Sequence, residues 1–136
     1  MKYLLDVNVL LALALDEHEF HTPVAAWVKR PAGSETPELA TCAITELGFV
    51  RILSQAQKYH RHVKQACALL MELKRGSKVP FSFLPDDQDI SRLPKWVFSS
   101  KQIRDGHLAE LWAANDVVLA TLDRRIRGAF VIPQHR

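Results

Sequence analysis

Four acidic residues interrupt the apolar pattern of this 136-residue chain, at positions that favour a buried side chain or the end of a strand: Asp6, Glu46, Asp105 and Asp123. Glu46 is followed by apolar residues at positions i+3, i+4 and i+7, and so is Asp105. At about 100° per residue, these spacings place each carboxylate on the apolar face of its own predicted helix. A buried carboxylate costs several kcal/mol unless it is neutralised or binds a cation. A bound metal ion would remove that cost.

The other two acids stand at or just beyond the carboxyl ends of predicted strands. Asp6 follows the apolar run 3–5, and Asp123 follows the apolar run 117–120. In an open parallel α/β sheet, the carboxyl ends of the strands form the edge at which functional sites lie. The sequence therefore predicts that acids far apart in the chain meet at one edge of a sheet.

Each acid also has an ordinary structural explanation when it is taken alone. Asp6 suits a helix N-cap, and Asp123 suits the solvated start of a helix. Glu46 can reach solvent from a boundary position, and Asp105 can pair with Arg104. For any one of these residues the structural explanation is the better one. Together they favour a shared site, because four independent coincidences would otherwise have to fall where one sheet brings them together.

Apolar runs of β-type alternate with helical periodicity along the chain. Strands are predicted at residues 3–5, 39–42, 81–84, 117–120 and 129–132. Strands that alternate with helices are typical of right-handed crossovers and a mostly parallel sheet. With an apolar content of 48%, the length suits one core, so we predict a single α/β domain over residues 1–136 with about five strands.

Helical periodicity fills most of the segments between these strands. One helix follows Asp6, two more contain Glu46 and Asp105, and two are predicted at residues 18–29 and 59–75. A surface loop is predicted from Pro31 to Pro37. Residues 90–100 are ambiguous, because a proline breaks their apolar pattern.

Basic residues gather in one part of the sequence. The segment 51–78 holds seven basic residues and one acidic residue, a formal charge of +6 in a chain of net charge +3. A basic surface beside an acidic pocket suits a polyanion whose phosphates are held while metal lies at the point of cleavage. The candidate residues are Arg51, Lys58, Arg61, Lys64, Arg124 and Arg125. For the lysine-rich helix alone, a solvated face is the better explanation.

Cysteines, histidines and the amino terminus carry little functional signal. Cys42 and Cys67 form no Cys-x-x-Cys pair, which favours small core residues in a reducing compartment. No histidine is assigned to a metal, and His107 is a candidate for contacting a substrate. Asp6 and Asn8 interrupt the apolar start of the chain, which favours a strand and a helix over a signal peptide. We expect a cytoplasmic protein.

The predicted cluster contains hard oxygen ligands only. Carboxylates suit Mg²⁺ or Mn²⁺, and two such ions about 4 Å apart can activate a water and stabilise the leaving oxygen of a phosphodiester. The chain has no Walker-type glycine loop, nucleophile elbow or Cys/His pair to indicate another catalytic centre. Hydrolytic cleavage is the expected activity.

Four short motifs in the chain also resemble those of a known family. They are LLDVNVLL at residues 4–11, TEL at 45–47, DGHLA at 105–109 and ATLDR at 120–124. In this order they resemble the PIN-domain nucleases, and among these most closely the VapC toxins of bacterial toxin–antitoxin pairs. The match spans nearly the whole chain.

The resemblance implies a three-layer α/β/α fold in which the four acids surround Mg²⁺ or Mn²⁺. Asn8 and Thr121 would then be polar residues that orient a carboxylate or a water. Proteins like VapC form homodimers, cleave RNA such as tRNA or rRNA, and are inhibited by a VapB-like antitoxin. In that family an aromatic residue commonly follows the fourth acid, where this chain has Arg125 and Ile126.

Three other functions stay open on the sequence. One is a housekeeping PIN-type nuclease for RNA processing. Another is an acid-lined module that binds RNA or protein without cutting it. A phosphotransfer receiver domain is the weakest alternative, because Asp86 or Asp87 would need a lysine after the last strand and none follows Ile132.

Overall fold

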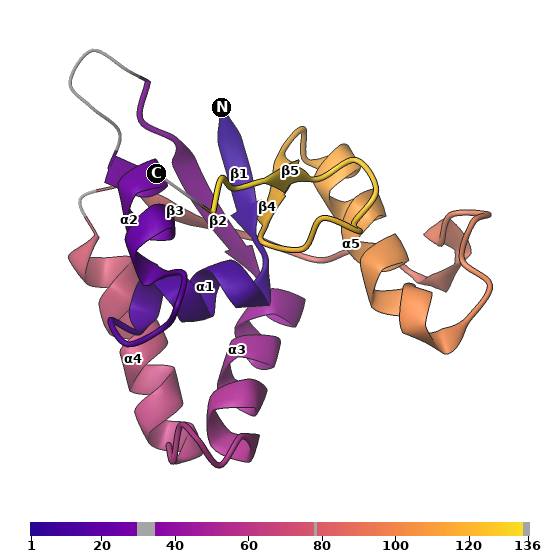
Figure 1. Ribbon diagram of the computed structural model, residues 1–136. Helices are drawn as coiled ribbons and strands as arrows, with labels where there is room; N and C mark the ends of the chain where they lie inside the picture. The colour runs from indigo at the N-terminus through magenta and orange to yellow at the C-terminus, as the bar shows by residue number, and fades with distance from the viewer. Residues whose placement is uncertain (30–34, 78, 135–136) are drawn as a thin grey trace.

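Five strands form a parallel sheet at the centre of the fold. They are β1 (Lys2–Leu5), β2 (Glu38–Cys42), β3 (Phe81–Leu84), β4 (Val118–Thr121) and β5 (Phe130–Val131). The computed structural model, which describes residues 1–29, 35–77 and 79–134, orders them β3-β2-β1-β4-β5 (Figure 1). All four pairings are parallel. The predicted α/β class, with a mostly parallel sheet of about five strands, is confirmed.

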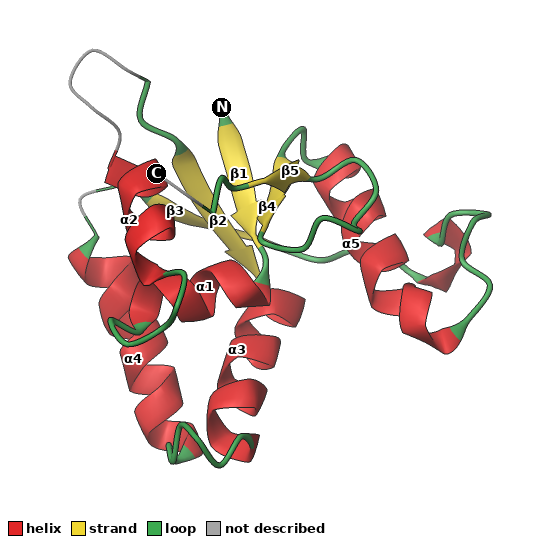
Figure 2. Ribbon diagram, in the orientation of Figure 1, coloured by secondary structure: helices red, strands yellow, loops and turns green. Residues whose placement is uncertain are grey.

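Helices cover both faces of this sheet. The α-helices are α1 (Val7–Ala14), α2 (His21–Lys29), α3 (Ala43–Gln55), α4 (Val63–Gly76) and α5 (Ile103–Ala114). Figure 2 shows α1 to α4 on one side of the sheet and α5 on the other, which gives the three layers that the resemblance implied. Within the described part of the chain, no helix has the length and apolarity needed to cross a membrane.

The sheet has an apolar core on each of its faces. Successive side chains of a strand point to opposite faces, so each strand contributes to both cores. Leu5, with no exposed surface, lies in the core between the sheet and helices α1 to α4. Its neighbour Leu4, also fully buried, packs with Leu108 and Leu111 of α5. The central strand is therefore buried on both faces, which is the usual reason for a continuous apolar run in a parallel sheet.

Two predicted helices begin later than their periodicity indicates. The helix expected from residue 18 begins at His21, because the His18 side chain accepts a hydrogen bond from the Phe20 backbone and makes a turn first. The helix expected from residue 59 begins at Val63. His60 has φ of +48°, a left-handed conformation that an α-helix does not contain.

The chain between β3 and α5 has no strand among residues 85–102. It holds two short 3₁₀ helices, η1 (Ile90–Arg92) and η2 (Ser100–Gln102), and projects beyond the sheet (Figure 1). This segment packs tightly on α5 at Gly106, where an added Cβ would lie 2.3 Å from a methyl carbon of Val97. Of the loop predicted from Pro31 to Pro37, residues 30–34 lie outside the described part of the chain.

Candidate active site

All four predicted acids lie at the carboxyl edge of the sheet. Asp6 directly follows β1, and Asp123 comes two residues after β4, the strand beside it. Glu46 and Asp105 lie in the first turns of α3 and α5. Because β1 and β4 are parallel neighbours, their ends deliver Asp6 and Asp123 to the same place.

Asp6 serves the fold and the candidate site at once. One oxygen, Oδ1, accepts a hydrogen bond from the Val7 backbone at 2.8 Å and caps α1. The other, Oδ2, accepts one from the hydroxyl of Thr121 at 2.7 Å. Asp6 is only 5% exposed. The capping explanation and the functional explanation of this residue therefore do not exclude each other.

Asn8 and Thr121 bind each other and join the ends of β1 and β4. The side-chain amide of Asn8 donates to the Thr121 hydroxyl at 3.3 Å, and its carbonyl oxygen accepts from the Leu122 backbone at 3.2 Å. The Thr121 hydroxyl also accepts from the Asp123 backbone at 3.1 Å. These contacts fix Asp6 and the start of the Asp123 segment relative to each other.

Asp105 lies within the electrostatic reach of two other acids. Burial raises the pKa of Asp105, the neighbouring Arg104 opposes this rise, and the negative charges of Asp6 and Asp123 add to it. Three carboxylates, one directly after β1, one in α5 and one two residues after β4, therefore share one electrostatic environment.

Asp123 is held by a basic neighbour from its own turn. Arg125 donates to its two carboxylate oxygens from Nε at 3.0 Å and from Nη2 at 3.2 Å. The backbone N–H of Arg125 donates to Oδ1 at 2.9 Å. These bonds, the side-chain bond first, lower the pKa of Asp123. The lowered pKa favours the charged form of Asp123. Its partner, the guanidinium group of Arg125, is exposed to solvent.

Glu46 faces different partners from the other three acids. Its Oε2 atom accepts hydrogen bonds from the Thr41 hydroxyl at 2.6 Å and from Lys74 Nζ at 2.5 Å. Two of the four acids therefore have a counter-ion within the protein: Asp123 pairs with the exposed Arg125, and Glu46 pairs with the largely buried Lys74.

The residues present suit a divalent cation by their chemistry. Asp6, Asp105 and Asp123 offer oxygen ligands only, which Mg²⁺ and Mn²⁺ prefer, and a cation would relieve both causes that raise the pKa of Asp105, first its burial and then the nearby charges of Asp6 and Asp123. In residues 1–29, 35–77 and 79–134, no three His, Cys, Asp or Glu side chains already stand at distances that would hold a metal ion. Binding would require these side chains to turn toward each other.

Two charged side chains at this edge have contacts that were not predicted: Lys74 binds Glu46, and Asp86 binds His107. Lys74 follows Ala66 and Leu70 at spacings of four residues, so its place in the buried stripe of α4 was readable in the sequence. Asp86 comes two residues after β3, and its Oδ2 lies 2.5 Å from Nε2 of His107. Burial raises the pKa of Asp86, but the bond with His107 and a backbone bond outweigh it, and the pKa lies below its ordinary value. Asp6 was predicted to lie at this edge because it follows a strand, and the same rule applies to Asp86.

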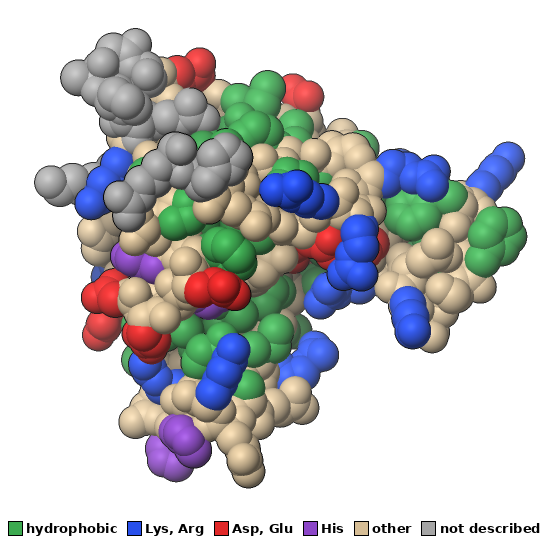
Figure 3. Space-filling view, in the orientation of Figure 1, with side chains coloured by type: hydrophobic (Ala, Val, Ile, Leu, Met, Phe, Trp, Pro, Cys, Tyr) green, Lys and Arg blue, Asp and Glu red, His purple; other side chains and the backbone are tan. Residues whose placement is uncertain are grey.

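The predicted phosphate-binding residues divide into two groups. Arg51 lines a cavity of about 600 Å³ together with Arg104 and His107. Arg124 and Arg125 line a second one, of about 610 Å³, that includes Asn8 and Asp123. Figure 3 shows Lys and Arg side chains on both sides of an acidic patch where the projecting segment leaves the body.

The other candidates lie near the turn between α3 and α4. Lys58 lies over the ring of Tyr59, Arg61 is 3.7 Å from Glu17, and Lys64 is exposed on α4. In Figure 1 this turn is at the far end of both helices from the sheet. The fold does not place these three residues beside the acids.

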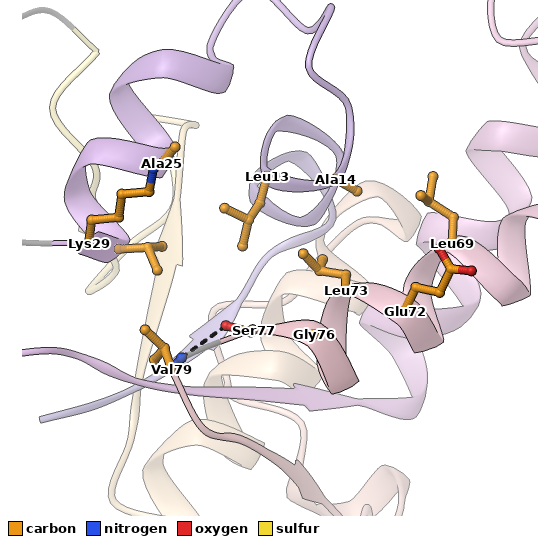
Figure 4. A pocket seen from close by; sticks show the side chains of 11 residues that line it. Leu13, Ala14, Ala25, Lys29, Leu69, Glu72, Leu73, Gly76, Ser77 and Val79 are labelled. Carbon is orange, nitrogen blue, oxygen red and sulfur yellow. Dashed lines mark hydrogen bonds between the residues drawn. The ribbon is translucent and has the colours of Figure 1, made fainter.

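A cavity of about 790 Å³ lies elsewhere, between α1, α2 and α4. Figure 4 shows Leu13, Leu69 and Leu73 among its lining residues, with Glu72 and Lys29 as its charged groups. None of the four predicted acids lines it. Glu72 is the one acid among its described lining residues, so the carboxyl edge of the sheet with its four acids, which we call the acid edge, is the candidate for chemistry.

Comparison with known proteins identifies relatives over most of the chain. Residues 3–129 match the sequence model of the PIN domain. Ribonuclease VapC44 of Mycobacterium tuberculosis is 35% identical over 133 residues, which cover 93% of this chain and 89% of the relative. Ribonuclease VapC38 of the same organism is 33% identical, over 98% and 91% of the two chains.

A solved structure also shares the fold. The crystal structure of Mycobacterium tuberculosis VapC20, described as a sarcin-ricin loop cleaving toxin, superposes with a TM-score of 0.58. The alignment covers 98% of this chain and 99% of that one, at 12% sequence identity. At that identity the likeness concerns the fold alone.

Proposed function

This chain belongs to the PIN domain family, and we propose that it is a metal-dependent endoribonuclease that acts as the toxin of a toxin–antitoxin pair. Similarity over most of their length to two ribonucleases named VapC supports this activity. The same similarity favours a toxin over a housekeeping RNA-processing nuclease or a non-catalytic binding module. The proposal treats residues 1–136 as one nuclease domain.

The observation that carries the proposal is the meeting of Asp6, Asp105 and Asp123. They come from distant parts of the chain, yet the charges of Asp6 and Asp123 add to burial, the larger cause, in raising the pKa of Asp105. Like charges that a fold holds close together lower its stability. Such clusters are typical of functional sites, where a ligand or a reaction uses the charge.

Asp6, Asp105 and Asp123 would hold Mg²⁺ or Mn²⁺, with Glu46 at the margin of the site. Such an ion supplies an activated water and neutralises charge on the phosphodiester under attack. Thr121 fixes Oδ2 of Asp6, so this carboxylate keeps one orientation. Asn8 supports the same hydroxyl from the other side.

RNA would be held on either side of these acids by arginine side chains. In the described part of the chain, Arg51 and Arg104 make no hydrogen bond or ion pair with a carboxylate, so both are available to phosphate oxygens. Arg124 lies on the other side, next to Asp123. A structured RNA such as tRNA or rRNA belongs to the proposal, as do a cytoplasmic location, a homodimer and a VapB-like antitoxin.

Replacing Asp6 by asparagine tests the proposal. Asparagine can still cap α1, so the fold should persist while one charged ligand is lost. Loss of a group that merely orients a metal ligand costs about 10- to 100-fold, so loss of the ligand itself should lower Mn²⁺-dependent RNA cleavage by at least about a hundredfold.

The matched control is Asp16→Asn, since the side chain of Asp16 is 95% exposed. Cleavage of a fluorogenic RNA and of total RNA would be measured for both variants, with circular dichroism to check the fold. Full activity of Asp6→Asn would rule out the proposed role of these acids.

A further inference from the structure

The fourth acid, Glu46, already has a cation within the protein. Lys74 Nζ and the Thr41 hydroxyl both donate to its Oε2 atom, at 2.5 Å and 2.6 Å. Thr41 lies only five residues before Glu46, whereas Lys74 lies 28 residues after it, on α4, so the ion pair is made by the packing of α4 on α3.

The pair formed by Glu46 and Lys74 is largely enclosed. The Lys74 side chain is 19% exposed and that of Glu46 is 24% exposed, whereas Thr41 is completely buried. The ammonium group also lies over the ring of Phe83, 5.6 Å from its centre. With these contacts on several sides, Lys74 has a defined position, unlike a lysine on an open surface.

Burial of the counter-ion separates Glu46 from the other acids, because the partner of Asp123, Arg125, is 90% exposed and screened by solvent. Asp105 is affected by the charges of Asp6 and Asp123, and a cation from outside would relieve their repulsion. Glu46 forms an ion pair with Lys74 that leaves no net charge to relieve. A divalent ion can use the Glu46 carboxylate only if it replaces the ammonium group, because both compete for the same oxygen.

We propose that Lys74 is the built-in counter-ion of Glu46 and competes with a divalent metal ion for its carboxylate. The metal is then bound chiefly through the three aspartates, and Glu46 joins it only when the bond to Lys74 breaks. This inference rests on the proposed function insofar as it assumes a divalent ion at the acid edge. It makes Lys74 a positioning residue that sets metal affinity.

The experiment measures Mn²⁺ binding without RNA, by calorimetry and by the electron paramagnetic resonance signal of free Mn²⁺. Lys74→Met removes the ammonium group and keeps the length and apolar stem of the side chain. We expect Mn²⁺ to bind this variant about tenfold more tightly than the wild type, a gain of about 1.4 kcal/mol. Lys74→Arg, which keeps the positive charge, should stay within about threefold of the wild type.

Two further variants separate the local contact from general electrostatics. Arg75→Met removes the same charge from the next, exposed residue of α4, and should change Mn²⁺ affinity by less than about twofold, as expected for a screened charge. In a Glu46→Gln background, Lys74→Met should give no gain, because Lys74 acts through Glu46.

The results distinguish this inference from the proposed function. Mn²⁺ binding that is equally tight in the wild type and in Lys74→Met would overturn the role of Lys74 and leave the nuclease proposal intact. If Lys74→Met still increases Mn²⁺ affinity in the Glu46→Gln background, the proposed role of Lys74 is overturned too. Absence of Mn²⁺ binding in all variants would overturn both. Lys74→Gln, with the same expectation as Lys74→Met, replaces it if that variant does not fold.

Discussion

Asp6 and Glu46 are held in similar ways on two sides of the same sheet edge. Each carboxylate accepts a hydrogen bond from a fully buried threonine of a strand, Thr121 for Asp6 and Thr41 for Glu46. The remaining partners differ. Asp6 receives a neutral backbone N–H, whereas Glu46 receives the ammonium group of Lys74. We call these two places the Asp6 corner (Asp6, Asn8 and Thr121) and the Glu46 corner (Glu46, Thr41 and Lys74).

The difference indicates which acid has charge to offer an external cation. Hydrogen bonds in the Asp6 corner orient the carboxylate but leave its negative charge unbalanced. The Glu46 corner is already an ion pair. One sheet edge can therefore hold acids in two electrostatic states, and the presence of a cationic neighbour decides between them.

Replacing the two threonines by valine tests this comparison most strongly. Thr121→Val keeps the shape but removes the donor to Asp6, and we expect kcat/KM for RNA cleavage to fall about 10- to 100-fold. Thr41→Val should lower it by less than about threefold, because Lys74 still holds Glu46. Steady-state cleavage of one fluorogenic RNA would compare them. Equal losses would contradict the distinction between the two corners.

A change where α1 crosses α3 should disturb both corners together. Gly48 lies two residues after Glu46, and a Cβ on it would come within 2.7 Å of Cγ2 of Val7, the residue after Asp6. Gly48→Ala gains about 1 kcal/mol of helix propensity, but overpacking costs about 1–3 kcal/mol, so we expect a net loss of stability.

Urea unfolding measures this loss, and Gly76→Ala is the control, since no described atom lies within 4 Å of its added Cβ. The control should leave the unfolding free energy unchanged or raise it slightly. If Gly48→Ala is as stable as the wild type, α1 and α3 can move apart without lowering the free energy of unfolding.

Asp105 should destabilise the metal-free protein. Because burial raises its pKa, the folded state binds a proton more tightly than the unfolded state at this residue. Its unfavourable contribution is absent below the ordinary carboxyl pKa and is fully present above the raised pKa. Asp105→Asn should therefore raise Tm at neutral pH in the presence of EDTA and have less effect at acidic pH, while it abolishes cleavage. A lower Tm at neutral pH would contradict this account.

Arg125→Ala should have the smallest effect of these changes. Arg125 lowers the pKa of Asp123, so its contribution to stability is present above the ordinary carboxyl pKa and is lost as the pH falls through the lowered value. Solvent screens this exposed arginine, and we expect no measurable change in Tm. NMR titration of the Asp123 carboxyl group should show its pKa rise. An unchanged pKa would show that the contact is absent in solution.

Much of the architecture could be predicted because it depends on local patterns. Strand positions followed from apolar β-type runs, and acids at strand ends had to lie at the shared carboxyl edge of a parallel sheet. The late start of α4 was missed, because the left-handed backbone of His60 has no periodic signal. The path of residues 85–102 was also missed, since it depends on packing against Gly106.

The sequence by itself determined the order of strands and helices, the α/β class and the edge at which the four acids emerge, because periodicity and strand direction are local properties. Only the tertiary structure decided which of these acids has a largely buried cation as its partner. Lys74 is 28 residues from Glu46 along the chain, and Thr121 is 115 residues from Asp6. The charge of a carboxylate is balanced only by a cation that lies close to it in space, and packing of the helices on the sheet sets that distance.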